Sequence, residues 1–178
     1  MPSTDTVLRG LDVPCQAIRA ALDELPWLDH AFGRAEILVR NPDRPRAAHY
    51  AVPDPGSDTE YIDLAPDASL INYAFLIADE RRGVDGIQRR ARVSIICVFD
   101  HRKLANHGIT SAGGVAHALA DKLQHNGRAQ VRYPVTASFE PRAVFSPVSI
   151  KTVPLVLLRR PYGCCRVDAD ISWLPNCP

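Results

Sequence analysis

The sequence carries almost no net charge and has no long apolar run. Its 21 Lys and Arg residues nearly balance its 20 Asp and Glu residues, which leaves a formal charge of +1 at pH 7. The molecule as a whole therefore has no field that would draw it to DNA or to an anionic membrane. No stretch approaches the roughly 20 apolar residues that cross a bilayer, and the N-terminal MPSTDTVLRG lacks a basic region followed by an apolar run. We expect no membrane partner, a cytoplasmic site of synthesis, and a local role for any basic cluster.

The cysteines lack the spacing of a zinc site or of a disulfide framework. No C-x2-C pair occurs, and adjacent cysteines rarely serve one tetrahedral ion. An odd number of cysteines in a reducing compartment also argues against disulfide bonds. The cysteines are therefore predicted to be buried small hydrophobic residues or incidental thiols. They are Cys15, Cys97, Cys164, Cys165 and Cys177.

Familiar catalytic motifs are absent as well. The sequence has no G-x-S-x-G, no H-E-x-x-H, and no lysine after the glycines of ITSAGGVAH, so Ser111 is better explained as a helix cap. In FDHRKLANH, a hydrolase or nuclease would need His101 and His107 to converge on one substrate atom. A magnesium site would need carboxylates held on rigid elements, and solvated acidic turns explain the acidic residues better. Those carboxylates are Asp54, Asp58, Glu60 and Asp63. We expect no enzyme, no cofactor and no catalytic or metal site.

The composition is that of one ordinary globular domain. With 178 residues, 46% hydrophobic and 23% charged, residues 1–178 are long enough to form a single core. The 15 prolines predict many loops and extended segments, because proline fixes φ and has no N–H. Residues 41–67, rich in prolines and carboxylates, are expected to be a long irregular loop that either makes contacts outside the domain or is partly disordered.

The chain shows two helical patterns. Apolar residues recur at helical spacing from about Asp12 to Leu25, with Asp12 as the expected N-cap and Pro26 as the stop. The second helix is expected from about Ala112 to His125, with a stop at Asn126 and Gly127.

The remaining patterns are those of strands. The segment from Ile71 to Phe99 is predicted to be a long antiparallel hairpin in which both faces are covered near the end of the second strand. Short strands are expected at Ala35 to Arg40 and in AQVRYPV. Cys165 to Trp173 alternates strictly, which predicts a final strand with one apolar and one wet face. The predicted class is α+β, with a mostly antiparallel β-sheet, two helices packed on one face and a long β-hairpin.

The hairpin tip is the best candidate for recognition. It is predicted to carry four arginines, Arg81, Arg82, Arg89 and Arg90. Their guanidinium groups can pair with carboxylates of a neighbouring subunit, contact nucleic-acid phosphates, or remain in water. Single-stranded nucleic-acid sites usually add exposed aromatic residues, and none lies between Ala78 and Ala91, which favours the subunit contact.

The order of these elements resembles phage tail terminator and tail completion proteins. The resemblance rests on an amphipathic first helix, a strand pair with a hairpin, a helix after SIICVFDHRKL, and a closing PYGCCRVDADISW strand. It implies a homo-oligomeric ring, most often of six copies, that caps the tail tube and joins it to the head–tail connector. The implied partners are other copies, the tail tube protein and the connector or adaptor protein. The implied location is the virion, with nucleic acid at most passing through the ring.

A ring of this kind needs two different surfaces that meet on neighbouring copies. We assign to these contacts the arginine-rich tip, Arg81, Arg82, Arg89 and Arg90, and the opposing carboxylates Asp54, Asp58 and Glu60. Opposite charge motivates this assignment.

Overall fold

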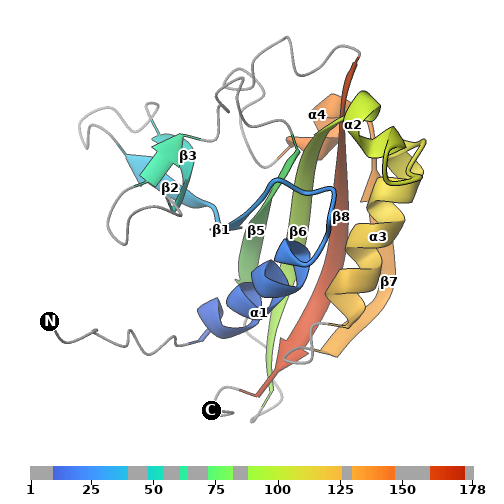
Figure 1. Cartoon of the computed structure of the whole chain (residues 1–178). Coiled ribbons are helices and arrows are strands. Elements are labelled where there is room, and N and C mark those ends of the chain that lie inside the picture. The colour runs from blue at the N-terminus through green and yellow to red at the C-terminus, as the bar shows by residue number, and fades with distance from the viewer. Residues whose placement is uncertain are drawn as a thin grey trace, which may run out of the picture.

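The computed structural model describes residues 10–39, 48–53, 61–63, 72–81, 88–125, 130–146 and 161–174. Its centre is a five-stranded sheet with strand order β1-β5-β6-β8-β7 (Figure 1). Strand β1 runs parallel to β5, and the other neighbours are antiparallel. The strands are β1 (His30–Arg34), β5 (Tyr73–Arg81), β6 (Arg89–Asp100), β7 (Gln130–Ser138) and β8 (Tyr162–Trp173). The predicted α+β class with a mostly antiparallel sheet is confirmed.

Two helices cover one face of this sheet, as expected. In Figure 1, α1 (Asp12–Asp23) lies in front of β5 and β6, and α3 (Ala112–Gln124) lies in front of β7 and β8. Two short helices, α2 (His101–Ala105) and α4 (Pro141–Val144), follow β6 and β7. Within the described residues, no helix is both long and apolar enough to cross a membrane.

The first helix begins at the residue expected to be its cap, which is one residue earlier than predicted. Asp12 is the first helical residue, and Leu11 occupies the N-cap position without a side-chain hydrogen bond. A carboxylate in the first turn still interacts favourably with the positive end of the helix dipole. The helix ends at Asp23, shortly before Pro26. Its apolar stripe is confirmed, because Ile18 and Leu22 are completely buried.

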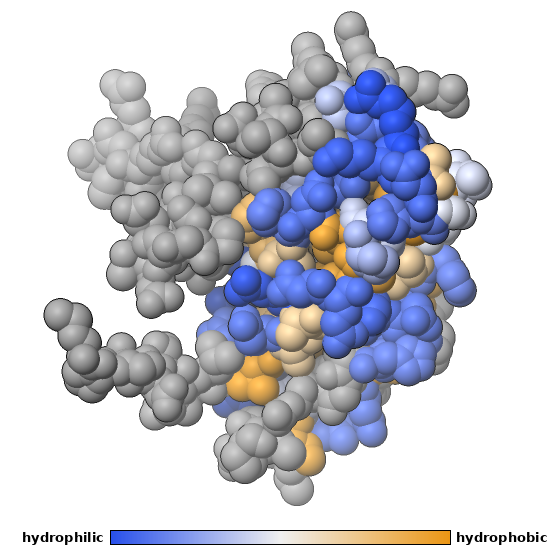
Figure 2. Space-filling model, in the orientation of Figure 1, coloured by the Kyte–Doolittle hydropathy of each residue, from blue (hydrophilic) through white to orange (hydrophobic). Residues whose placement is uncertain are grey.

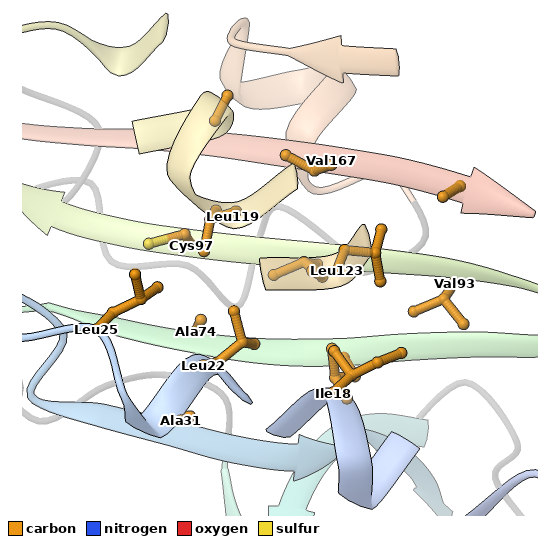
Figure 3. Packing of buried hydrophobic residues seen from close by; sticks show 14 of the residues in the cluster. Ile18, Leu22, Leu25, Ala31, Ala74, Val93, Cys97, Leu119, Leu123 and Val167 are labelled. Atoms are coloured by element: carbon orange, nitrogen blue, oxygen red, sulfur yellow. The ribbon is translucent and has the colours of Figure 1, made fainter. Parts of the chain in front are cut away.

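The larger core lies between the two helices and the sheet. Figure 3 shows Ile18 and Leu22 of α1 and Leu119 and Leu123 of α3 close to side chains of the strands. Each of these four side chains is fully buried, and leaving water stabilises the fold by about 2 kcal/mol per side chain. The hydrophilic residues of both helices face outward, with hydrophobic residues visible between them (Figure 2). The strands alternate accordingly, so Val93, Ile95, Cys97 and Phe99 of β6 face the helices.

A smaller core lies on the opposite face, beneath α4. Ile96 and Val98 of β6 contribute to it, which confirms that both faces of this strand are covered near its end. The aromatic rings of Phe32 and Tyr73 meet edge to face with centroids 6.1 Å apart. The other members are Ala35, Phe75, Val144, Phe145 and Cys164.

The segment expected to be an irregular loop contains strands. A separate three-stranded antiparallel sheet has the order β2-β3-β4, with β2 at Glu36–Val39, β3 at Ala48–Pro53 and β4 at Tyr61–Asp63. The expectation for residues 41–67 was therefore wrong at 48–53 and 61–63. Strands this short show little sequence periodicity, and cross-strand pairing decides their conformation. The first of the expected short strands, Ala35 to Arg40, corresponds to β2.

Candidate subunit interface

Three of the four arginines expected at the hairpin tip lie on strands of the main sheet. Arg81 is the last residue of β5, and Arg89 and Arg90 begin β6, so these three lie within the paired strands. Arg89 is aligned with Trp173 of β8, and Arg90 with both Arg81 and Ser172. Backbone pairing extends past the apolar residues because ladder hydrogen bonds do not depend on side-chain polarity. Arg82 lies outside the described residues.

Adjacent arginines in a strand face opposite sides of the sheet. The guanidinium of Arg89 lies on the helix side, where its NH1 is 3.6 Å from the position a Cβ on Gly10 would occupy. Arg90 shares the other face with Arg92 and Ser94. The sheet therefore separates the two arginines, and one acidic partner surface cannot engage both in the same way. The opposing carboxylates Asp54, Asp58 and Glu60 lie outside the described residues.

A polar cluster on the face away from α1 and α3 was not anticipated from the sequence. Asp168 of β8 accepts a hydrogen bond from Ser94 Oγ on β6 and one from Arg166 Nε at 2.8 Å. Arg166 also donates to Ser146 Oγ at 2.8 Å, and Arg92 NH2 lies 3.9 Å from Asp168 Oδ2. The wet face predicted for β8 is thus partly wrong, because Asp168 and Ser172 are buried. The sequence signal for this cluster was the presence of polar residues at Ser94 of β6 and Asp168 of β8, which lie opposite each other in the paired strands.

Beside this cluster lies a hollow of about 210 Å³. Arg92, Thr136, Asp168, Ala169 and Asp170 line it. Both signs of charge line the hollow, and the buried carboxylate is already held by Ser94 and Arg166. The cluster therefore ties β6, β8 and the segment after α4 together.

Two of the residues suspected of chemistry at the end of β6, Asp100 and His101, have structural roles. Asp100 is the N-cap of α2 and accepts hydrogen bonds from Arg102 N at 2.8 Å and Arg102 NH2 at 2.6 Å. The hydrogen bond from the Arg102 side chain lowers the pKa of the Asp100 carboxyl, an effect opposed by burial. The His101 ring packs edge-on against Phe99, with centroids 5.2 Å apart. His107 lies exposed in the turn after α2.

Asn72 links the region just before β1 with β5 and β6. Its Nδ2 donates to the Trp27 carbonyl at 2.8 Å, and its Oδ1 accepts from Asp100 N at 2.8 Å. Its own N–H donates to Asp29 Oδ2 at 3.1 Å. These bonds satisfy the polar atoms of a side chain that is 2% exposed.

The described cysteines, Cys15, Cys97, Cys164 and Cys165, are all buried. Burial raises the pKa of the Cys15 thiol to about 12 and that of Cys164 to about 11. Cys97 lies directly across from Cys165 in the paired strands. Burial raises the pKa of the Cys97 thiol well above its usual value. A protonated thiol is a poor nucleophile and a poor metal ligand. In the described part of the chain, no group of three or more His, Cys, Asp or Glu residues can hold a metal ion.

An apolar groove lies between α3 and β7. Its volume is about 440 Å³, and Val167 of β8 contributes to its lining. From α3, the small residues Gly113, Ala116 and Ala120 line it, together with the polar residues His117 and Gln124. Phe139, just after β7, borders this groove and also a second hollow of about 230 Å³ that is lined by His101 and Tyr162. Phe139 is 46% exposed, which is unusual for a large apolar side chain beside a groove.

The two edge strands of the main sheet, β7 and β1, have different neighbours. Among the described strands, β7 pairs with β8 alone, so no described strand occupies its outer edge. Pro134 lies within β7 at a break in register between Arg132 and Thr136, and proline within a sheet is confined to edges and bulges. On the other side, β1 leads into the small sheet, which lies away from α3 and β7 (Figure 1).

Searches with this chain find no matching family model, no matching curated protein and no matching solved structure.

Proposed function

We propose that this chain is a structural virion protein of the phage tail terminator or tail completion kind. It forms a homo-oligomeric ring, with six copies as the expected number, that caps the tail tube and joins it to the head–tail connector. The observation that carries this proposal is the difference between the two sides of the main sheet. On one side, β7 has an outer edge that no described strand occupies, beside an apolar groove, and on the other side the chain continues into a small sheet.

A closed ring requires this kind of asymmetry. In a head-to-tail contact, a surface on one copy meets a different surface on the next, and the contact repeats until the ring closes. A chain whose two sides were alike would favour a two-fold dimer instead. The outer edge of β7, which no described strand occupies, and the small sheet beyond β1 supply two unlike surfaces on opposite sides of one copy (Figure 1).

The local chemistry also favours assembly over catalysis. Asp100 caps a helix, His101 packs on Phe99, and the cysteine thiols Cys15 and Cys164 stay protonated. Catalytic groups usually combine a perturbed pKa with a partner and access to substrate. Here the hydrogen bond from Arg102 that lowers the pKa of Asp100 stabilises the fold at a helix end.

The proposed partners are other copies of the chain, the tail tube protein and the head–tail connector protein, and the proposed location is the virion after assembly in the host cytoplasm. Nucleic acid has no assigned site and would pass through the ring. The separation of Arg89 from Arg90 by the sheet favours this assignment over a single DNA-binding tip.

Light scattering coupled to size exclusion tests the proposal. The purified full chain should form a ring or should bind the tail tube protein of the same phage, and negative-stain electron microscopy should show rings at tube ends. A chain that stays monomeric at every concentration and ignores the tube protein would contradict the proposal. A metal-dependent nuclease activity abolished by His101→Ala would establish the alternative function, that of a small hydrolase or nuclease.

A further inference from the structure

The groove between α3 and β7 has the shape and chemistry of a site for an added strand. On the helix side, Gly113, Ala116 and Ala120 leave space between His117 and Gln124. Val135, Thr136 and Ala137 form the strand side. Adding an extended segment to an open sheet edge gives affinity through main-chain hydrogen bonds, and pockets beside the edge receive alternate side chains. The groove supplies such a pocket directly beside an edge that no described strand occupies.

Only part of β7 can accept a new strand. Pro134 has no N–H, and the register with β8 breaks between Arg132 and Thr136. Regular pairing with β8 resumes at Thr136 and continues to Ser138. The accepting segment is therefore the end of β7 nearest Phe139, which also borders the groove. This segment, Thr136 to Phe139, has the length of a short donor strand.

The chain itself offers a donor of this length. Strand β2 has four residues, pairs only with β3 among the described strands, and lies on the far side of the main sheet from β7. Its sequence, EILV, has an apolar residue at both parities, so either register brings at least one apolar residue toward the groove. One copy cannot join its own β2 to its own β7 across the sheet that separates them.

We propose that β2 of a second copy adds to the β7 edge and that its apolar residues enter the groove between α3 and β7. This inference rests on the proposed function and names the joint of the ring. It pairs two strand edges that have no other partner among the described strands, and unpaired edges invite uncontrolled association. The contact is head to tail, because each copy gives β2 on one side and receives β2 on the other.

Two matched pairs of variants test the groove. Phe139→Ser and His117→Glu change exposed groove residues, whereas Leu174→Ser and His107→Glu make the same changes at exposed residues that do not line the groove. Sedimentation of the full chain should show association weakened at least about tenfold by the groove changes, the effect of losing roughly 1.4 kcal/mol. The two control variants should match the parent. Equal association of Phe139→Ser and the parent would overturn the inference.

Mixing variants tests the donor and the direction of the contact. Neighbouring strand residues point their N–H groups to opposite sides, so one of Ile37→Pro and Leu38→Pro removes an outward donor and keeps the pairing with β3. That variant, identified by its unchanged circular dichroism and melting temperature, should be monomeric alone. Mixed with Phe139→Ser, it should form a heterodimer, because one intact β2 then meets one intact groove. Two folded variants that fail to combine, or a proline variant that assembles like the parent, would overturn β2 as the donor.

Failure of this inference is distinguishable from failure of the proposed function. If the parent forms rings that the groove variants leave intact, the joint lies elsewhere while the ring stands. If the parent neither self-associates nor binds the tail tube protein, the proposed function fails and the inference fails with it.

Discussion

Arg166 and Asp168 lie two residues apart on one face of β8, and their Nε and Oδ1 atoms are 2.8 Å apart. Both side chains are largely withdrawn from water, at 12% and 8% exposure. The pair is tolerated because its remaining hydrogen-bonding capacity is used: Ser94 donates to the carboxylate, and Ser146 accepts from the guanidinium. A buried pair with these partners fixes the register of β6 against β8.

Replacing Asp168 with alanine should destabilise the protein strongly. The change leaves the Arg166 charge and the Ser94 hydroxyl without their acceptor in a buried setting. Breaking a buried pair in this way costs about 3 kcal/mol, measured as the free energy of unfolding in urea. Asp170→Ala, on the same strand face but exposed, should change that free energy by less than about 0.5 kcal/mol. Equal effects of the two variants would argue against the cluster as a stabilising element.

Two helix caps should differ in their dependence on pH. Asp100 caps α2 through Arg102 N, and Ser111 caps α3 by accepting from Gly114 N at 3.1 Å. Asp100→Ala and Ser111→Ala should each cost about 1 kcal/mol at pH 7. The pKa of Asp100 is lower in the folded protein than in the unfolded chain, so its contribution is complete above the unfolded pKa, near 4, and is lost as the pH falls through the folded value.

Urea unfolding at a series of pH values from 7 down to 2 separates the two caps. The difference between the parent and Asp100→Ala should shrink as the pH drops, while the difference between the parent and Ser111→Ala should stay constant. A constant difference for Asp100→Ala would mean that its carboxylate charge does not contribute.

The sequence predicts the parts of the fold whose side chains repeat with a clear period. Ile18 and Leu22 on α1 and the alternation from Cys165 to Trp173 gave elements within a few residues of those observed. Strand β1, which pairs in parallel with β5, was missed because HAFGR has no clean alternation. Its place depends on partners distant in the chain, such as Asn72. Local periodicity carries no information about such pairing.

The candidate interface was less predictable than the fold. Counting arginines near a turn suggested one basic tip, but Arg89 and Arg90 separate because alternation in a strand sends neighbours to opposite faces. No sequence pattern predicts the groove at Phe139, because Gly113, Ala116 and Ala120 are residue types common in helices that pack on a core. They suggest a binding site only because they lie beside the outer edge of β7, which no described strand occupies.

Gly163 should be intolerant of any side chain. A Cβ at this position would lie 2.5 Å from Phe99 Cε2 and 2.9 Å from His101 Nε2. Phe99 is fully buried and cannot move aside without repacking the core, so Gly163→Ala should cost about 1–3 kcal/mol in the free energy of unfolding. Gly113→Ala is the control, since a Cβ there meets nothing closer than 3.7 Å and alanine favours a helix by up to about 1 kcal/mol. Opposite signs are expected for the two variants.

The native protein should protect its described cysteines from alkylation. Cys15, Cys97, Cys164 and Cys165 are buried, and burial raises the pKa of the Cys15 thiol to about 12 and that of Cys164 to about 11. The thiolate is the reactive species, so at pH 8 these residues should react with iodoacetamide only as the structure opens. Peptide mass spectrometry after timed exposure, with and without urea, measures each residue.

Cys164 should be the first of these four to react in the native state. It is 5% exposed and borders the hollow beside Phe139, whereas Cys97 and Cys165 are completely buried between the sheet and the helices. In urea, all four should react at similar rates because their environments become equivalent. Native alkylation of Cys97 or Cys165 as fast as that of Cys164 would show that the helix face opens as readily as the α4 face, which the packing of α1 and α3 on the sheet argues against.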